Sequence, residues 1–198
     1  VLELLNHLSL DKVAILGTSR GGLNAMGLSA GAKDRLLGVA LNDVGPVIES
    51  KGLEMIRHYI GRNPAAKTYE EAVASMATAF PEFKNVPTSR WMEEAQKHYV
   101  QTDGGLQITY DPKLRDAVLA TMDQPAPDLW PFFDVMAGLP IACLWGMNST
   151  LLSKSTVEEM QRRRPDMIMG NIPGRGHVPF LDEPEAVAAL NEWLGKLQ

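Results

Sequence analysis

Apolar residues in the first 46 positions occur in short runs that alternate with helix-like stretches. The runs Val13–Leu16 and Leu36–Leu41 are short, rich in aliphatic side chains and bounded by turn residues, as is typical of buried parallel strands. The apolar residues of Val1–Leu10 have the spacing of a helix, and Leu23–Ala30 has the small-residue content of one. The order helix, strand, helix, strand predicts an α/β fold with a parallel sheet flanked by helices.

The pattern changes between residues 47 and 127. Strand-like runs disappear, and Gly52–Ile60, Tyr69–Thr78 and Arg90–Val100 read as amphipathic helices separated by Pro and Asp/Asn breakers. The α/β pattern returns at residue 128, with a short helix or turn, a strand, a helix, a strand and a last helix expected at Leu129–Ala137, Ile141–Trp145, Ser153–Arg164, Met167–Ile172 and Pro184–Leu197. We therefore predict a core formed by residues 1–46 and 128–198, interrupted by a helical insertion at 47–127.

The composition excludes several classes of protein. The 198 residues include 19 Lys and Arg against 24 Asp and Glu, a net charge of −5, which gives no basic footprint for nucleic acid. The single Cys rules out an internal disulfide framework and a Cys-rich zinc site, and no His/Asp/Glu cluster has the spacing of metal ligands. No run approaches the roughly 18 apolar residues of a membrane span. Neither a metal nor another cofactor is expected.

A candidate nucleophile lies between the first strand and the next helix. Gly17-Thr18-Ser19-Arg20-Gly21 has the form G-x-S-x-G, and a strand-to-helix turn is the context in which this pattern forms a nucleophile elbow. The sharp turn predicts a strained backbone at Ser19, with Gly17 and Gly21 free of Cβ atoms that would collide across it. The backbone N–H of Arg20 is positioned to donate to a developing oxyanion.

A serine nucleophile needs a base, and the chain has four histidines. His7 lies on the first helix, and His58 and His98 lie on helices of the insertion, where exposed positions are the default. His177 instead follows the last strand, and the loops beyond the carboxyl ends of parallel strands build the sites of open α/β sheets. His177 is therefore the predicted general base for Ser19.

With these motifs in place, the chain resembles the α/β-hydrolase superfamily, and in particular its bacterial serine hydrolases with a helical cap. The resemblance extends over essentially the whole chain and is carried by Val13–Gly22, Leu41–Pro46, Ile141–Ser153 and Gly176–Leu181. It implies that residues 47–127 form the cap. It also implies that a complete member has about four further strands upstream, including the loop that donates the second oxyanion N–H. On this basis we expect an N-terminally truncated chain.

The chain departs from the family pattern at the acid of the triad. The family usually places an Asp where Thr150 stands, and a threonine cannot carry the negative charge that stabilises an imidazolium. Its hydroxyl could still orient His177. Asp43 is the second candidate acid, because some members supply the acid after the strand that ends at Leu41, although an Asp there also suits a turn. Asp166 and Asp182, which are near His177 in sequence, are interpreted as turn or surface residues.

These residues predict two-step acyl transfer to water, with an ester or related acyl bond of a small to medium substrate as the target. Arg20 could bind a substrate carboxylate, as a lactone or C–C bond hydrolase would require, or it could pair with Asp43. The insertion is apolar enough to favour a hydrophobic acyl group, and its aromatic residues are Tyr59, Phe80, Phe83, Trp91, Tyr99 and Tyr110.

The alternative is a degenerate or incomplete hydrolase-fold protein with a binding role, which Thr150 and the absent upstream loop would suit. An open edge at strand 13–16 would favour a homodimer through strand edges. The lack of a signal sequence favours a cytoplasmic location.

Overall fold

The computed structural model describes residues 1–122 and 124–197, and these divide into two compact units. Unit 1 consists of Val1–Glu49 and residues 128–198, and unit 2 of Ser50–Pro127. The expected boundary at 46/47 thus lies three residues before the observed one, and the boundary at 127/128 coincides with it. Each expected range, 47–127 and 128–198, includes one residue outside the described ones, 123 and 198 respectively.

Unit 1 is built on a parallel four-stranded sheet with the order β1-β2-β5-β6. The strands are β1 (Val13–Thr18), β2 (Leu36–Asn42), β5 (Ile141–Gly146) and β6 (Ile168–Ile172). The register pairs Thr18 with Asn42 and Asn42 with Leu144, so the carboxyl ends of β1, β2 and β5 reach the same level. The α/β fold with a parallel sheet flanked by helices is confirmed, and all four strands coincide with apolar runs of the sequence.

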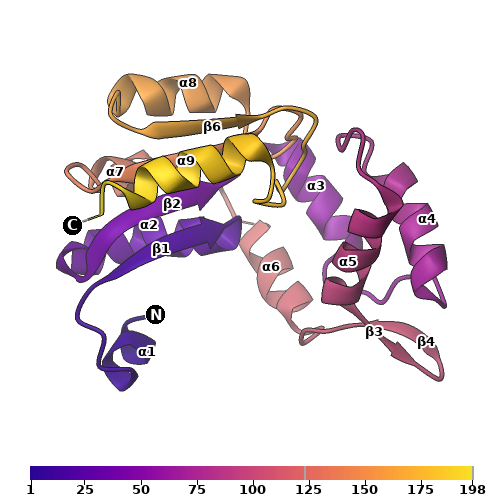
Figure 1. Cartoon of the computed structure of the whole chain (residues 1–198). Coiled ribbons are helices and arrows are strands. Elements are labelled where there is room, and N and C mark those ends of the chain that lie inside the picture. Colours follow the sequence, from indigo (N-terminus) through magenta and orange to yellow (C-terminus); the bar gives the residue numbers. More distant parts are fainter. Residues whose placement is uncertain (123, 198) are drawn as a thin grey trace. The chain divides into compact units, whose positions relative to one another are not determined.

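Helices cover both faces of this sheet (Figure 1). The helical elements of unit 1 are α1 (Leu2–His7), α2 (Arg20–Ala32), η1 (Lys33–Arg35), α7 (Trp130–Asp134), α8 (Lys154–Arg163) and α9 (Pro184–Leu194). One buried cluster joins α2, α7 and α8 to Val39, Leu41 and Cys143. The other joins α9 to Ala40, Ala142 and Leu144. Successive strand residues therefore alternate between the two clusters, as expected for strands that are buried on both sides.

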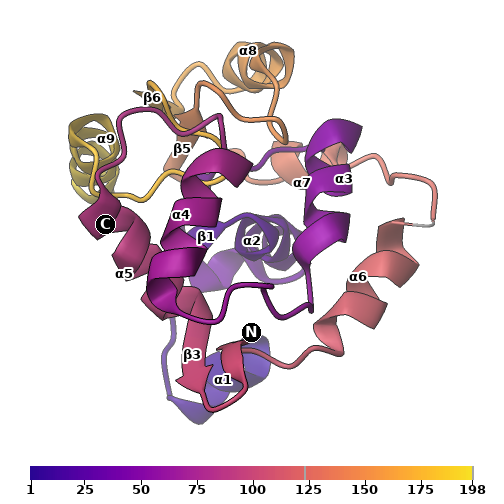
Figure 2. The same ribbon diagram turned by 90° about the vertical axis from the view of Figure 1, so that its right-hand side faces the viewer.

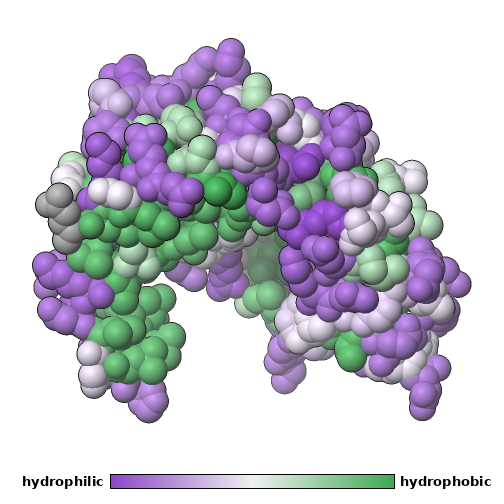
Figure 3. All heavy atoms as spheres, in the orientation of Figure 1, coloured by the Kyte–Doolittle hydropathy of each residue, from purple (hydrophilic) through white to green (hydrophobic). Residues whose placement is uncertain are grey.

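At the β1 end of the sheet, apolar side chains remain exposed. Within the described part of the chain β1 pairs only with β2, and Leu16 is 43% exposed. The short helix α1 buries Leu5 but exposes Leu4 and Leu8 by more than half, and Figure 3 shows apolar residues gathered over this helix. No helix among the described residues is long and apolar enough to span a bilayer.

Unit 2 contains α3 (Ser50–Tyr59), α4 (Tyr69–Ala79), α5 (Thr88–His98) and α6 (Leu114–Met122), with α4 packed beside α5 (Figure 2). It also contains a hairpin that the sequence pattern missed, formed by β3 (Tyr99–Thr102) and β4 (Gly105–Ile108). The expected helix Arg90–Val100 was wrong at its end, because Tyr99 and Val100 belong to this hairpin. Its two-residue connection is Asp103-Gly104, a pair that favours tight hairpins, and Gly105 follows with a φ of +116°.

Candidate active site

Ser19 lies in the turn that links β1 to α2, at the carboxyl edge of the sheet. Its φ of 50° and ψ of −117° fall outside the regions that residues with a side chain normally occupy, which is the strain expected of a nucleophile elbow. The backbone N–H of Ser19 donates to the carbonyl of Asn42 over 3.1 Å. The turn is thereby attached to the end of the neighbouring strand β2.

Gly17 and Gly22 make this turn possible, whereas the sequence predicted Gly17 and Gly21. A Cβ on Gly17 would lie 2.5 Å from the nitrogen of Gly22, so no side chain fits there. A Cβ on Gly22 would lie 2.4 Å from Cγ1 of Val44, whereas a Cβ on Gly21 would meet no atom within 4 Å. The prediction that Gly21 prevents a collision was wrong, because the phase of α2 turns Gly22 toward β2 and Gly21 away from it.

His177 connects Ser19 to Asp43. It lies in the loop between β6 and α9, and its side chain is 13% exposed. Nε2 of His177 is 2.9 Å from Oγ of Ser19, and Nδ1 is 2.8 Å from Oδ2 of Asp43. This is the spatial order of a nucleophile, a base and an acid that orients the base.

Asp43 directly follows β2 and is fully buried, with a φ of 52°. Its backbone N–H donates to the carbonyl of Leu144 over 2.8 Å, which fixes it to β5. Oδ1 accepts from the N–H of Gly146 at 2.9 Å, and Oδ2 accepts from Oγ of Ser149 at 2.6 Å as well as facing His177. These contacts hold the buried carboxylate in a fixed position at the end of β2.

Within residues 1–122 and 124–197, neither Thr150 nor Asp166 pairs with His177. In the described parts of the chain, Thr150 makes no hydrogen bond to His177, so the usual acid position of the family is not the partner of the base here. Asp166 is paired with Arg164 over 2.7 Å, and these hydrogen bonds lower the pKa of Asp166. The three remaining histidines, His7, His58 and His98, are exposed on helices α1, α3 and α5.

Arg20 begins α2 immediately after the nucleophile. Its side chain is exposed and, within residues 1–122 and 124–197, forms neither a hydrogen bond nor an ion pair; the suggested pairing with Asp43 is therefore not found. Its backbone N–H belongs to the first turn of the helix, where donors have no partner within the helix. Both the guanidinium and this N–H are thus available to a substrate.

The loop that carries His177 is held by residues that sequence reasoning missed. The buried Glu183 accepts from Nε of Arg175 at 2.7 Å and from the backbone N–H groups of Phe180 and Leu181 at 3.1 and 2.9 Å. Nδ2 of Asn42 donates to the carbonyl of Pro179 at 3.3 Å and to Oγ1 of Thr18 at 3.2 Å. Glu183-Pro184 signals a helix start in the sequence, but nothing there indicates its contacts with the loop.

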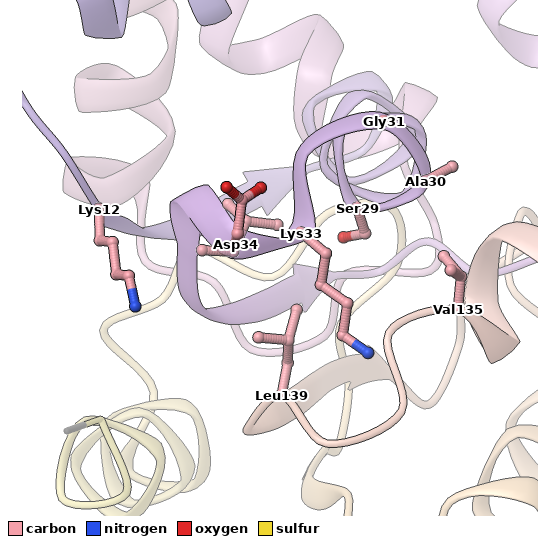
Figure 4. Close-up of a pocket in the computed structure, with 9 residues that line it drawn as sticks. Lys12, Ser29, Ala30, Gly31, Lys33, Asp34, Val135 and Leu139 are labelled. Carbon is pink, nitrogen blue, oxygen red and sulfur yellow. The ribbon is translucent and has the colours of Figure 1, made fainter.

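A depression of about 650 Å³ lies elsewhere on unit 1 (Figure 4). Its lining residues include Lys12, Ser29 and Lys33, and they come from the amino-terminal ends of the strands and the end of α2. Oγ of Ser29 donates to the carbonyl of Ala25, and Nζ of Lys33 donates to that of Ala137. Because Ser19, Asp43 and His177 follow the carboxyl ends of their strands, this depression is separate from them.

Comparison with known proteins identifies the family of this chain. Residues 1–190 match the model of the alpha/beta hydrolase family. A 3-hydroxybutyrate-oligomer hydrolase from Cupriavidus necator is 32% identical over 196 residues, which cover 95% of this chain and 67% of that protein. A 2-(acetamidomethylene)succinate hydrolase from Mesorhizobium japonicum is 27% identical over 187 residues, 93% of this chain and 64% of that protein. The chain thus spans about two thirds of the length of both relatives.

Solved structures show the same relationship. The crystal structure of an alpha/beta hydrolase from Novosphingobium aromaticivorans is 33% identical, with a TM-score of 0.90 over 98% of this chain and 70% of that one. The crystal structure of E-2-(acetamidomethylene)succinate hydrolase, 22% identical, has the same fold, with a TM-score of 0.78 over 98% of this chain and 70% of that one. The chain therefore belongs to the alpha/beta hydrolase family and is a hydrolase.

Proposed function

We propose that this protein is a serine hydrolase that cleaves a carboxylic ester through an acyl-enzyme formed on Ser19. The observation that carries the proposal is the continuous contact from Ser19 through His177 to Asp43, with distances of 2.9 and 2.8 Å. Asp43, rather than Thr150, is the proposed acid. A binding protein that had lost catalysis would have no need of a base placed between a strained serine and a buried carboxylate.

The proposed reaction has two symmetrical halves. Oγ of Ser19 bonds to the ester carbonyl carbon while Nε2 of His177 takes its proton, and the N–H of Arg20 donates to the oxyanion. The bond to the alcohol oxygen then breaks, and His177 returns the proton to that oxygen. Water attacks the acyl-enzyme in the same way, releasing the acid and restoring Ser19. Asp43 holds the imidazole in the tautomer with hydrogen on Nδ1 and stabilises the imidazolium.

We further propose a small substrate that carries a carboxylate, such as a short oligoester of a hydroxy acid. The relative from Cupriavidus necator is named for the hydrolysis of 3-hydroxybutyrate oligomers, and a linear oligomer of this kind ends in a carboxylate. The exposed guanidinium of Arg20, adjacent in sequence to Ser19, supplies a matching charge. A substrate of this type is more polar than the hydrophobic acyl group that the insertion alone suggested.

Active-site labelling tests the mechanism. We expect one fluorophosphonate adduct by intact mass on the wild-type chain and none on Ser19→Ala or His177→Ala. A wild-type chain that stays unlabelled while correctly folded would overturn the serine mechanism and favour the binding role.

Hydrolysis assays test the substrate class. The dimer of 3-hydroxybutyrate and its methyl ester differ only in the terminal carboxylate. We expect Arg20→Gln to raise KM for the free acid by about tenfold to a hundredfold and to leave the methyl ester unchanged, since a hydrogen bond to a charged group is worth about 1.5–3 kcal/mol. Arg62→Gln, which removes an exposed arginine of unit 2, is the matched control. Equal effects of Arg20→Gln on both substrates would contradict the carboxylate contact.

A further inference from the structure

Ser149 lies in the loop after β5, next to the position where the family usually carries its acid. Its backbone N–H closes a turn onto the carbonyl of Gly146 at 2.8 Å, and its Oγ is 2.6 Å from Oδ2 of Asp43. That carboxylate oxygen is the one that faces Nδ1 of His177 at 2.8 Å. Ser149 therefore hydrogen-bonds to the carboxylate that contacts the proposed base, but it does not contact the base itself.

The direction of the Ser149 hydroxyl is fixed by its other contacts. Oγ accepts hydrogen bonds from the backbone N–H groups of Leu151 and Leu152, both at 3.1 Å. A serine oxygen has two lone pairs and one proton, and the two N–H groups occupy the lone pairs. The single proton is left to donate to Asp43. The hydroxyl of Ser149 therefore donates to Asp43, and it has no lone pair left to accept from that side.

From this we infer that Ser149 is a positioning residue of the triad. Its hydroxyl holds the Asp43 carboxylate in line with His177, and its hydrogen bond weakens the electrostatic attraction between that carboxylate and the imidazolium. The inference rests on the proposed function. It also gives a role to the end of β5 and the loop after it. Here Gly146 and Ser149 donate hydrogen bonds to Asp43, the acid that follows the neighbouring strand β2.

The charged and titratable groups around this site define what the hydroxyl can change. Asp43 follows β2, Arg20 begins α2, Cys143 lies on β5, and Arg175 and Glu183 flank the His177 loop. Burial and the negative charge of Asp43 raise the pKa of the Cys143 thiol, which therefore stays neutral. Arg175 and Glu183 are paired with each other at 2.7 Å. Asp43 is thus the anion in contact with His177, and Ser149 is the side chain that shares its Oδ2.

Loss of the Ser149 hydroxyl has a predictable sign. The Asp43 charge is then shared by fewer donors, so it stabilises the imidazolium more strongly. Because neutral His177 is the active form of the base, the acid limb of the kcat/KM profile moves to higher pH. We expect a shift of about half to one pH unit in Ser149→Ala, with kcat reduced about tenfold to a hundredfold.

The experiment compares pH profiles of ester hydrolysis from pH 5 to 9 for the full chain and its variants. Ser149→Thr keeps the hydroxyl and should restore the wild-type limb. Thr150→Ala removes the adjacent hydroxyl, which makes no hydrogen bond among the described residues, and should leave the limb in place. Ser149→Cys keeps the approximate volume of the side chain but has only a weak donor, so we expect it to shift the limb in the same direction as Ser149→Ala. It replaces Ser149→Ala in the experiment if that variant does not fold.

Each outcome either supports or overturns the inference about Ser149. A limb that moves in Ser149→Ala or Ser149→Cys but not in Thr150→Ala supports the inference. A reduced kcat with the limb unmoved means that Ser149 only shapes the loop and overturns it, as does an unchanged profile. A wild-type chain without ester hydrolysis or fluorophosphonate labelling refutes the proposed function itself, which is a separate result.

Discussion

Replacement of Asp43 by Asn is the sharpest test of the triad, because the surroundings of this carboxylate are fully specified. Oδ1 accepts from the N–H of Gly146, and Oδ2 accepts from the hydroxyl of Ser149 and faces Nδ1 of His177. All of these neighbours are donors in the active arrangement. An asparagine has one oxygen and one NH₂ group, so either orientation of its amide places two donors against each other.

The two orientations are not equivalent. With the NH₂ group toward Gly146, the opposing donor is a backbone N–H that cannot move. With the NH₂ group toward His177, the imidazole can respond by shifting its proton to Nε2, which leaves Nδ1 to accept. This orientation removes the conflict at His177 but still sets the NH₂ group against the hydroxyl of Ser149, so neither orientation restores the wild-type contacts. Wherever the second orientation is populated, His177 points an N–H at Ser19, where a base is needed. In a trypsin-like protease the equivalent wrong tautomer costs about 10⁴-fold in kcat. We expect a loss of about this size here.

The assay is the rate of fluorophosphonate labelling together with ester turnover, on Asp43→Asn and on Asp166→Asn as the matched control. Asp166 is 64% exposed and paired with Arg164 rather than with the base, so its variant should remain within about twofold of the wild type. A folded Asp43→Asn chain that keeps more than about a tenth of the wild-type rate would refute the argument. The acid would then have to come from another residue.

Three further predictions concern the stability of unit 1. Gly22→Ala should lower stability by about 1–3 kcal/mol and abolish labelling because of the 2.4 Å contact with Val44, whereas Gly21→Ala should keep or raise Tm, since its Cβ meets no atom; thermal melts of both variants check this. Glu183→Gln should cost about 1–3 kcal/mol in urea unfolding and lower kcat, because its NH₂ group would face backbone donors of the His177 loop. Hydrogen bonds from two arginines lower the pKa of Glu159 from 4.5 to about 2, so its stabilising effect is complete above pH 4.5 and is lost as the pH falls toward 2. The Tm difference between wild type and Glu159→Gln should therefore vanish at about pH 2, and a difference that persists there would contradict the pairing.

The elements of unit 1 could be predicted because their sequence signals are local. A strand buried on both faces is an unbroken apolar run, and the helices between such runs need only connect them. The hairpin Tyr99–Ile108 was missed because each of its strands has four residues, too few for an alternating pattern to stand out against helical spacing. The Asp103-Gly104 connection was the available signal for it.

The site was predictable only in part, for a related reason. Ser19 and His177 are identified by a motif and by their position after a strand, which are properties of the chain order. The choice between Asp43 and Thr150 depends instead on which of the two residues, one after β2 and one after β5, lies within hydrogen-bond distance of His177. Both follow strands that end at the same edge of the sheet, and the sequence does not contain the distance from either to His177. The supporting contacts of Ser149 and Asn42 have the same non-local character.

The sheet order gives a physical reason why the end of β5 carries a glycine. Ser19 follows β1, Asp43 follows β2 and His177 follows β6, so the His177 loop has to pass over the end of β5 to reach both partners. Gly146 ends β5 at this crossing, and a Cβ there would lie 2.6 Å from the carbonyl oxygen of Gly176 and 2.7 Å from that of Arg175. The same residue donates its N–H to Asp43. A loop after β6 that brings His177 to both Ser19 and Asp43 therefore requires a residue without a side chain at the end of β5, since a Cβ at position 146 would displace that loop.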